Sequence, residues 1–367
     1  SGLMLILSAD LLLWLNSVTE DTIHEDSFHF LLPGVMNSTL CQCTASAACL
    51  IFRKGFEVLY PFNMEFYLMA GCMVYVMWKN VGRGTSPDHR PHVNEKLTLR
   101  AMYRDGVLYG LAAGALVLAA GVTVFILYQV WVSRRLLRHT AFLIFYGYHL
   151  AVMPAMSLCC LAGMLVHRLE RRENEAGRNP TRSLDVTLLV GAALGQLALS
   201  YFSLVAAMAV GTGGTLGDLD LSYSLLSLLE LILQNIFIIE GLHRHPSLLA
   251  KRKERRRSNV FKVRRRRGAP RECLASRSLK WMIICAHDGK KPWTKRAIQE
   301  ICAFLILSNV MLWVIPAFGV HPQFENGLGK QFFGFSAWFV LVNLGQPLSV
   351  FYRMHSVGAL VELLIAA

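Results

Sequence analysis

The sequence predicts an all-α polytopic membrane protein, because its composition is strongly apolar and its apolar residues gather into long runs. Of its 367 residues, 54% are hydrophobic and 17% are charged, and the mean hydropathy is +0.41. A soluble domain of this length carries more charge, and a helix needs roughly 20 apolar residues to cross a bilayer. About eight runs approach that length. They cover residues 2–18, 57–78, 106–132, 140–167, 185–210, 221–242, 298–319 and 331–352.

The charge of the connections between these runs predicts the side of the membrane on which each one lies. The connection 19–56 is acidic and carries a glycosylation acceptor at Asn37, so we expect it outside the cell. The connections rich in Lys and Arg, which are expected in the cytoplasm, are 79–105, 168–184 and 243–297. The connection 133–139 is basic although it should lie outside, so either it enters the membrane interface or a span is miscounted.

Two segments at opposite ends of the chain resemble each other. One reads LILSAD and ends at Asp10, and the other reads LILSN and ends at Asn309. Each is followed by an apolar run with a Trp, and further along by a related segment that contains Tyr75 or Tyr352. With a one-residue gap, Asp10 aligns with Asn309 and Tyr75 with Tyr352. Because repeats in membrane proteins usually mean two related bundles, the sequence predicts transport through both halves.

Several polar side chains fall inside the predicted spans, where they are expensive and therefore mark functional candidates. Tyr223, Ser227, Glu230 and Gln234 recur every three or four residues, which places them on one helix face. Carboxylate, amide and phenol groups together can form a hydrogen-bonded cluster that accepts and passes protons. The alternative is that these groups only hold helices together. The candidates for a proton pathway are Asp10, Tyr75, Glu230, Gln234, Asn309, Tyr352 and His355.

Taken together, these segments resemble the otopetrins, a family of proton-selective channels. The motifs that carry the resemblance are SADLLLWL at 8–15, YVMWKNVGR at 75–83, LELILQN at 229–235, EGL at 240–242, LILSNVMLW at 305–313 and FYRMHS at 351–356. The family has about twelve spans in two halves, forms homodimers and opens to extracellular acid. This chain resembles it from the fifth span onward and opens on Ser1 inside an apolar run, so we expect an earlier part of the protein to precede it.

The resemblance implies how the chain is organised. Residues 1–82 would hold the last two spans of the N-terminal half, and residues 83–105 would be a cytoplasmic linker. Residues 106–367 would form the C-terminal half, with six spans and a basic cytoplasmic loop at 243–297.

The resemblance also implies the site and the function. Glu230, Asn309 and Tyr352 would form a cluster in the C-terminal half, and Asp10 and Tyr75 would belong to a Gln–Asp–Tyr cluster in the N-terminal half. The implied protein is a proton-selective channel that conducts protons into the cytoplasm in response to extracellular acid. It would be a homodimeric, multi-pass protein of the plasma membrane, with membrane lipid, sterols included, as a partner and zinc as an inhibitor.

The histidines have separate expected roles. His24 and His321, in the predicted outer connections, are candidates for pH sensing or zinc inhibition. His149 is expected to be a packed, hydrogen-bonded side chain, and His355 is either a proton exit or an interfacial cap. A disulfide among the outer cysteines is open, because its pairing cannot be read from the sequence. These cysteines are Cys41, Cys43 and Cys49.

We expect no cofactor, no structural metal and no nucleic-acid partner. The chain has no Walker loop, no dinucleotide-binding context and no Cys pairs at zinc spacing. The basic run 251–267 is expected to be a cytoplasmic linker that enforces topology, although in isolation it could bind anionic lipid or nucleic acid.

Two other classes of protein compete with the channel. The first is a membrane-embedded, acyltransferase-like enzyme, with His149 and Asn309 as its candidate residues. The second is a non-conducting membrane scaffold. Independently of function, glycines at spacings of four residues predict close helix contacts, between the two halves or between subunits. They are Gly106, Gly110 and Gly114 in one span and Gly191 and Gly195 in another.

Overall fold

The computed structural model is almost entirely helical in the part of the chain that it describes. That part comprises residues 2–29, 59, 63, 66–79, 81, 107–132, 134, 136–169, 180–210, 214–243, 293–318, 320 and 327–366. The helices are α1 (Gly2–His29), a helix Phe66–Lys79, α4 (Tyr109–Val132), α5 (Arg138–Leu169), α6 (Pro180–Val210), α7 (Thr215–His243), α10 (Trp293–Ala317), α12 (Leu328–Phe333) and α13 (Phe335–Ala366).

Six of these helices, α4, α5, α6, α7, α10 and α13, are long and apolar enough to cross a membrane. They correspond to the six predicted runs from residue 106 onward, and the two earlier runs contain the shorter apolar helices Gly2–Ser17 and Phe66–Lys79. The prediction of an all-α polytopic membrane protein is confirmed. The basic connection 133–139 has a full-length helix on each side, so the structure gives no sign of a miscounted span there.

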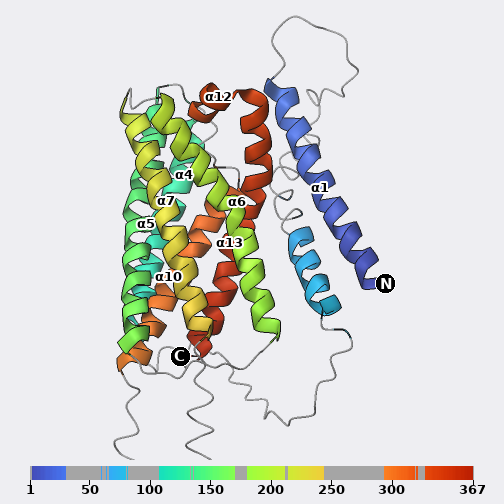
Figure 1. Cartoon of the computed structure of the whole chain (residues 1–367). Helices are drawn as coiled ribbons and strands as arrows, with labels where there is room; N and C mark the ends of the chain where they lie inside the picture. Colours follow the sequence, from blue (N-terminus) through green and yellow to red (C-terminus); the bar gives the residue numbers. More distant parts are fainter. Residues whose placement is uncertain are drawn as a thin grey trace, which may run out of the picture.

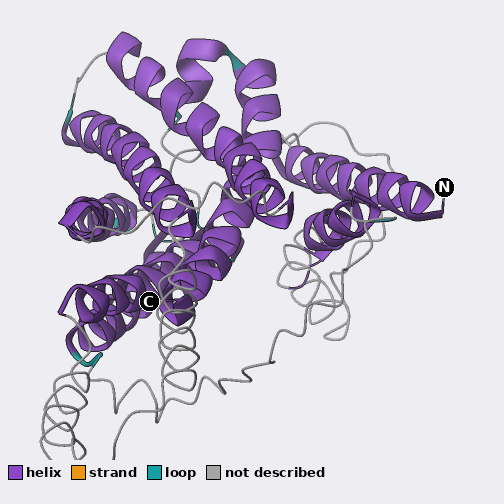
Figure 2. Ribbon diagram, turned by 60° about the horizontal axis from the view of Figure 1, so that its bottom comes forward, coloured by secondary structure: helices purple, strands orange, loops and turns teal. Residues whose placement is uncertain are grey.

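The six long helices form one bundle, in which helices that follow one another along the chain run antiparallel (Figure 1). Helix α10 packs on α4, α5 and α13, while α6 packs on α7 and α13. Helix α1 and helix Phe66–Lys79 lie together to one side of this bundle, beside α13 (Figures 1 and 2). The helix ends that lead into the Lys- and Arg-rich connections all lie at the end of the bundle that carries the C-terminus, opposite α12 (Figure 1).

The last helix differs from its prediction in both of its ends. The apolar run 331–352 predicts one span, but Gly334, with φ 80°, separates the short helix α12 from α13. Helix α13 then continues to Ala366, well past Tyr352. The predicted run ends at residue 352, because a charged side chain such as that of Arg353 is unusual inside a span. In the structure, however, Arg353 is only 4% exposed. Its burial requires a partner inside the bundle.

Gly110, Gly114 and Gly195 serve contacts within the bundle rather than between halves or subunits as predicted, while Gly106 falls outside the described residues. A Cβ atom on Gly110 or Gly114 would collide with Glu300 or Leu307 of α10. A Cβ atom on Gly195 would likewise collide with α13. These glycines therefore allow α4 to approach α10, and α6 to approach α13, at close range. Gly191 differs from the others, because a Cβ atom there would meet open space.

Replacing Gly110 tests this close contact. Gly110→Ala should destabilise the protein by about 1–3 kcal/mol, because the added methyl group meets the rigid backbone of Glu300. The matched control is Gly147→Ala, where a Cβ atom has open space and alanine should be neutral or stabilising by up to about 1 kcal/mol. Thermal unfolding of the purified proteins in detergent measures both changes. Equal melting temperatures for the two variants would contradict the contact.

Candidate functional site

A buried ion pair lies at the centre of the bundle. Glu230 on α7 is 0% exposed and Arg353 on α13 is 4% exposed. Arg353 Nη1 donates to Glu230 Oε1 at 2.9 Å, and Nη2 donates to Oε2 at 2.8 Å. Two parallel bonds of this kind give the strongest and most directional pairing available to a carboxylate. The bundle can bury these opposite charges together, because either one alone would be far more costly.

Amide and phenol groups continue from the ion pair to form one hydrogen-bonded network. Arg353 Nη1 also donates to Asn309 Oδ1 at 3.2 Å, and Asn309 Nδ2 donates to Gln234 Oε1 at 2.8 Å. The Tyr352 hydroxyl accepts from Gln234 Nε2 and from Asn235 Nδ2, both at 3.2 Å. We call Glu230 and these five residues the central cluster. It joins α7, α10 and α13, and it brings together the predicted Glu230, Gln234, Asn309 and Tyr352.

A second group, the serine cluster, links α6 to α7 and α13. Gln196 Nε2 donates to Ser200 Oγ at 3.1 Å and to Ser227 Oγ at 2.9 Å, and the two hydroxyls lie 2.9 Å apart. The Ser349 hydroxyl donates to Oε1, the side-chain amide oxygen of Gln196. Ser349 lies four residues before Arg353 on α13, and Ser227 lies three residues before Glu230 on α7. The serine cluster therefore lies about one helical turn from the ion pair on both helices.

Nearer the end of the bundle that carries α12, a tyrosine and an aspartate form a buried pair. Tyr146 Oη donates to Asp220 Oδ1 at 2.8 Å, and the two residues are 0% and 3% exposed. The ring of Tyr223 lies between this pair and His149, with centroids 5.7 Å from Tyr146 and 5.5 Å from His149. His149 Nδ1 lies 2.9 Å from the carbonyl oxygen of Phe145, one turn away, which confirms the predicted packed histidine.

A small cavity lies among these groups. Its volume is about 50 Å³, which is enough room for at least one water molecule. Its polar lining consists of His149, Gln196, Tyr223, Gln346, Ser349 and Arg353. The cavity therefore touches the serine cluster, Arg353 of the central cluster, and the ring of Tyr223, which packs on Tyr146. Polar groups thus follow one another through the interior of an otherwise apolar bundle.

Comparison with known proteins decides the family. The model of the otopetrin family matches residues 32–260 and 275–354. This chain belongs to the otopetrin family. It is 45% identical to "Proton channel OTOP3" of Homo sapiens, over 100% of this chain and 61% of the relative. It is 36% identical to "Proton channel OTOP2" of Mus musculus, over 99% of this chain and 69% of the relative. It is 34% identical to "Proton channel OTOP1" of Danio rerio, over 98% and 66%.

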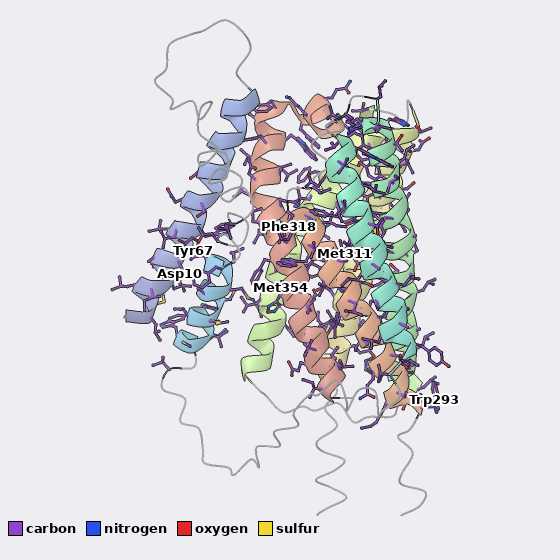
Figure 3. All side chains as sticks on the ribbon, turned by 180° about the vertical axis from the view of Figure 1, so that it is seen from behind. Asp10, Tyr67, Trp293, Met311, Phe318 and Met354 are labelled. Carbon is purple, nitrogen blue, oxygen red and sulfur yellow. The ribbon has the colours of Figure 1, made fainter. Side chains whose placement is uncertain are left out.

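In this otopetrin, the N-terminal candidates are less closely connected than the central cluster. Asp10 is half-buried on α1, next to Gly71 of helix Phe66–Lys79 and at the level of Tyr67 (Figure 3). Among the described residues, its buried Oδ2 atom has no hydrogen-bond partner. The ring of Tyr75 contacts Trp78, with centroids 6.0 Å apart. Within the described residues, the structure gives no hydrogen bond between Asp10 and Tyr75.

Among the remaining candidates, only His355 has a side chain that the structure describes. His355 is half-buried one turn after Phe351, and the two rings stack with centroids 5.8 Å apart. His24 belongs to α1, but its side chain falls outside the described residues. His321, Asn37 and the outer cysteines Cys41, Cys43 and Cys49 also fall outside them.

Sequence reasoning missed several members of this buried polar set, among them Arg353, Gln196 and Asp220. Arg353 directly follows Tyr352 in the FYRMHS segment and lies just beyond the predicted apolar run 331–352. The signal that could have found it is Glu230, because a carboxylate in mid-span calls for a cation on another helix. Gln196 lies among small and apolar residues, where one amide gives no periodic pattern.

The ion pair can be tested with a double-mutant cycle. Glu230→Gln should destabilise the protein by about 3–5 kcal/mol, because it leaves the Arg353 guanidinium buried without a carboxylate. Glu230→Gln combined with Arg353→Gln should recover most of that loss, since no lone charge remains. Denaturation of the purified proteins in lipid nanodiscs measures each free energy of unfolding. A double variant as unstable as the single one would refute the pairing.

Proposed function

We propose that this chain forms the conducting part of a proton-selective channel that admits protons to the cytoplasm when the extracellular side is acid. Three otopetrin relatives that resemble the chain over 98–100% of its length are named proton channels. The chain spans 61% of the length of the human OTOP3 protein, so the activity of the whole protein is part of the proposal. The observation that carries it is the central cluster, which joins three helices in mid-bundle.

The proposed route passes through the bundle formed by α4 to α13. A proton would enter near the Tyr146–Asp220 pair and reach the cavity beside Tyr223 and His149. Water in the cavity would carry it to the ion pair, because a buried water bridges polar groups about as well as a direct hydrogen bond does. From there it would pass through the central cluster to His355, one turn beyond Tyr352 on α13, which is the candidate exit.

Within the central cluster the residues have different chemical capacities. Glu230 can bind and release a proton, since a carboxyl group titrates. The Tyr352 hydroxyl can donate and accept at once, so it can pass a proton without changing its charge. The amides of Gln234 and Asn309 do not titrate, and they link the Tyr352 hydroxyl to Arg353, and through Arg353 to Glu230.

The two-halves organisation and the partners are part of the same proposal. Residues 1–82 would form the last two spans of an N-terminal half, whose proton route would use Asp10 and Tyr75. Residues 106–367 would form the C-terminal half, and residues 83–105 would link the two. The channel would be a homodimer in the plasma membrane, in contact with lipid. Zinc would inhibit it at His24 and His321, so a zinc block that persists after both are replaced by alanine would contradict this assignment.

An enzyme that pairs His149 with Asn309 receives no support from the geometry. His149 Nδ1 is engaged with the carbonyl of Phe145 on its own helix. Asn309 is engaged with Gln234, Arg353 and the carbonyl of Leu305. Neither side chain is left positioned to activate the other, so we do not propose a membrane-embedded acyltransferase.

Removing one oxygen group from the central cluster should reduce proton conduction. Tyr352→Phe deletes the hydroxyl that accepts from Gln234 and Asn235, and Glu230→Gln deletes the titrating group. Each change should lower the acid-evoked proton current per surface molecule by about 10²-fold or more, the scale for loss of a proton-transferring group. Patch-clamp recording with surface biotinylation measures current and delivery together.

The matched control for these changes is Glu362→Gln, which alters an exposed carboxyl group on α13 outside the central cluster. Its current should equal that of the unsubstituted protein. Unchanged current in both Tyr352→Phe and Glu230→Gln, with surface delivery confirmed, would rule out the route through this bundle.

A further inference from the structure

We infer that Arg353 is a specificity-determining residue, whose fixed positive charge keeps metal cations out of the proton route. This inference rests on the proposed proton channel function and assigns one part of its selectivity to one side chain. It follows from where the charge lies, how firmly it is held and what the cavity beside it can accommodate.

The ion pair presents only its positive member to the cavity. Arg353 lines the cavity, whereas Glu230 does not. Among the described residues that line it there is no Asp or Glu. A cation in the cavity therefore faces a guanidinium, and no carboxylate among the described lining residues. The pair as a whole is neutral, but its orientation makes it repulsive from the cavity.

The charge of Arg353 is permanent and is held in place. A guanidinium does not lose its proton in proteins, so its charge does not depend on the pH on either side. Its two terminal nitrogens are fixed by the carboxylate of Glu230, and one of them also donates to Asn309. Ser349, one turn earlier on α13, is bonded to Gln196 and so fixes the cavity wall beside it. A side chain held in this way does not swing aside for a passing ion.

A sodium ion and a proton meet this charge differently. The cavity, at about 50 Å³, has room for only a few waters, since each needs about 10–15 Å³ of such space, so it is too small for an ion with its full hydration shell. A bare sodium ion would have to replace its shell with neutral oxygens such as those of Gln196 and Ser349 while facing the guanidinium. A proton needs no such space, because it moves by bond exchange and is neutralised on reaching Glu230.

The experiment measures the reversal potential of the acid-evoked current with external sodium, and again with sodium replaced by a large organic cation. Arg353→Gln removes the charge from the cavity wall. The proton-to-sodium permeability ratio should fall at least about tenfold. A unit charge a few ångströms from the path changes the energy of a cation by at least the roughly 1.4 kcal/mol to which a tenfold ratio corresponds. The matched control is Arg353→Lys, which keeps the charge and should keep the ratio.

A second variant keeps an ion pair while reversing its orientation. In Glu230→Arg combined with Arg353→Glu, opposite charges still face each other across α7 and α13, but the cavity is lined by the carboxylate. This exchange should also lower the permeability ratio, and it can do so without leaving an unpaired charge in the bundle.

The outcomes separate the two proposals. If the unsubstituted protein gives no acid-evoked proton current, the proposed function fails and this inference fails with it. If the unsubstituted protein conducts protons and Arg353→Gln stays as selective as Arg353→Lys, the proposed function survives and the role of Arg353 is refuted. If Arg353→Gln or the exchanged pair admits sodium while Arg353→Lys does not, the inference is supported.

Discussion

The Glu230–Arg353 ion pair is the interaction on which the rest of this bundle depends. Two opposite charges are buried in an apolar interior, and their attraction offsets the free-energy cost of removing each from water. Because they come from α7 and α13, the pair fixes the register between these helices, and its bond to Asn309 extends that constraint to α10. The close packing of α4 on α10 and of α6 on α13, which their glycines permit, completes the bundle around the pair.

The same constraint gives the bundle its chemical capacity. A carboxylate that is held by two hydrogen bonds lies at a defined place, so hydroxyl and amide groups can be arranged around it at fixed distances. The central cluster, the serine cluster and the Tyr146–Asp220 pair are successive polar groups in one apolar bundle. The cavity beside Arg353 adjoins the serine cluster and the ring of Tyr223, which packs on Tyr146. In the proposed channel, the polar groups that stabilise helix packing would also be the groups that transfer protons.

Much of this arrangement follows from local sequence, and the remainder depends on pairing across the bundle. The apolar runs predict the long helices, and the spacing of Tyr223, Ser227, Glu230 and Gln234 predicts a polar face, because both signals repeat along one helix. Arg353 escaped prediction because its burial is decided by a residue 123 positions away. The end of α13 at Ala366 was not predicted for the same reason. An arginine without a partner would have ended the span at residue 352, and only the pairing with Glu230 lets the helix continue. The glycine contacts were assigned to the wrong partners, because spacing shows that a helix can approach another but does not show which one.

The most direct test of the account is proton flux into liposomes that contain the purified protein. An outside-acid step is applied with the membrane potential clamped by potassium and valinomycin, and internal pH is read with a trapped dye. The account predicts rapid internal acidification that persists when all external sodium is removed. Liposomes that hold folded, correctly inserted protein and acidify no faster than empty ones would contradict it.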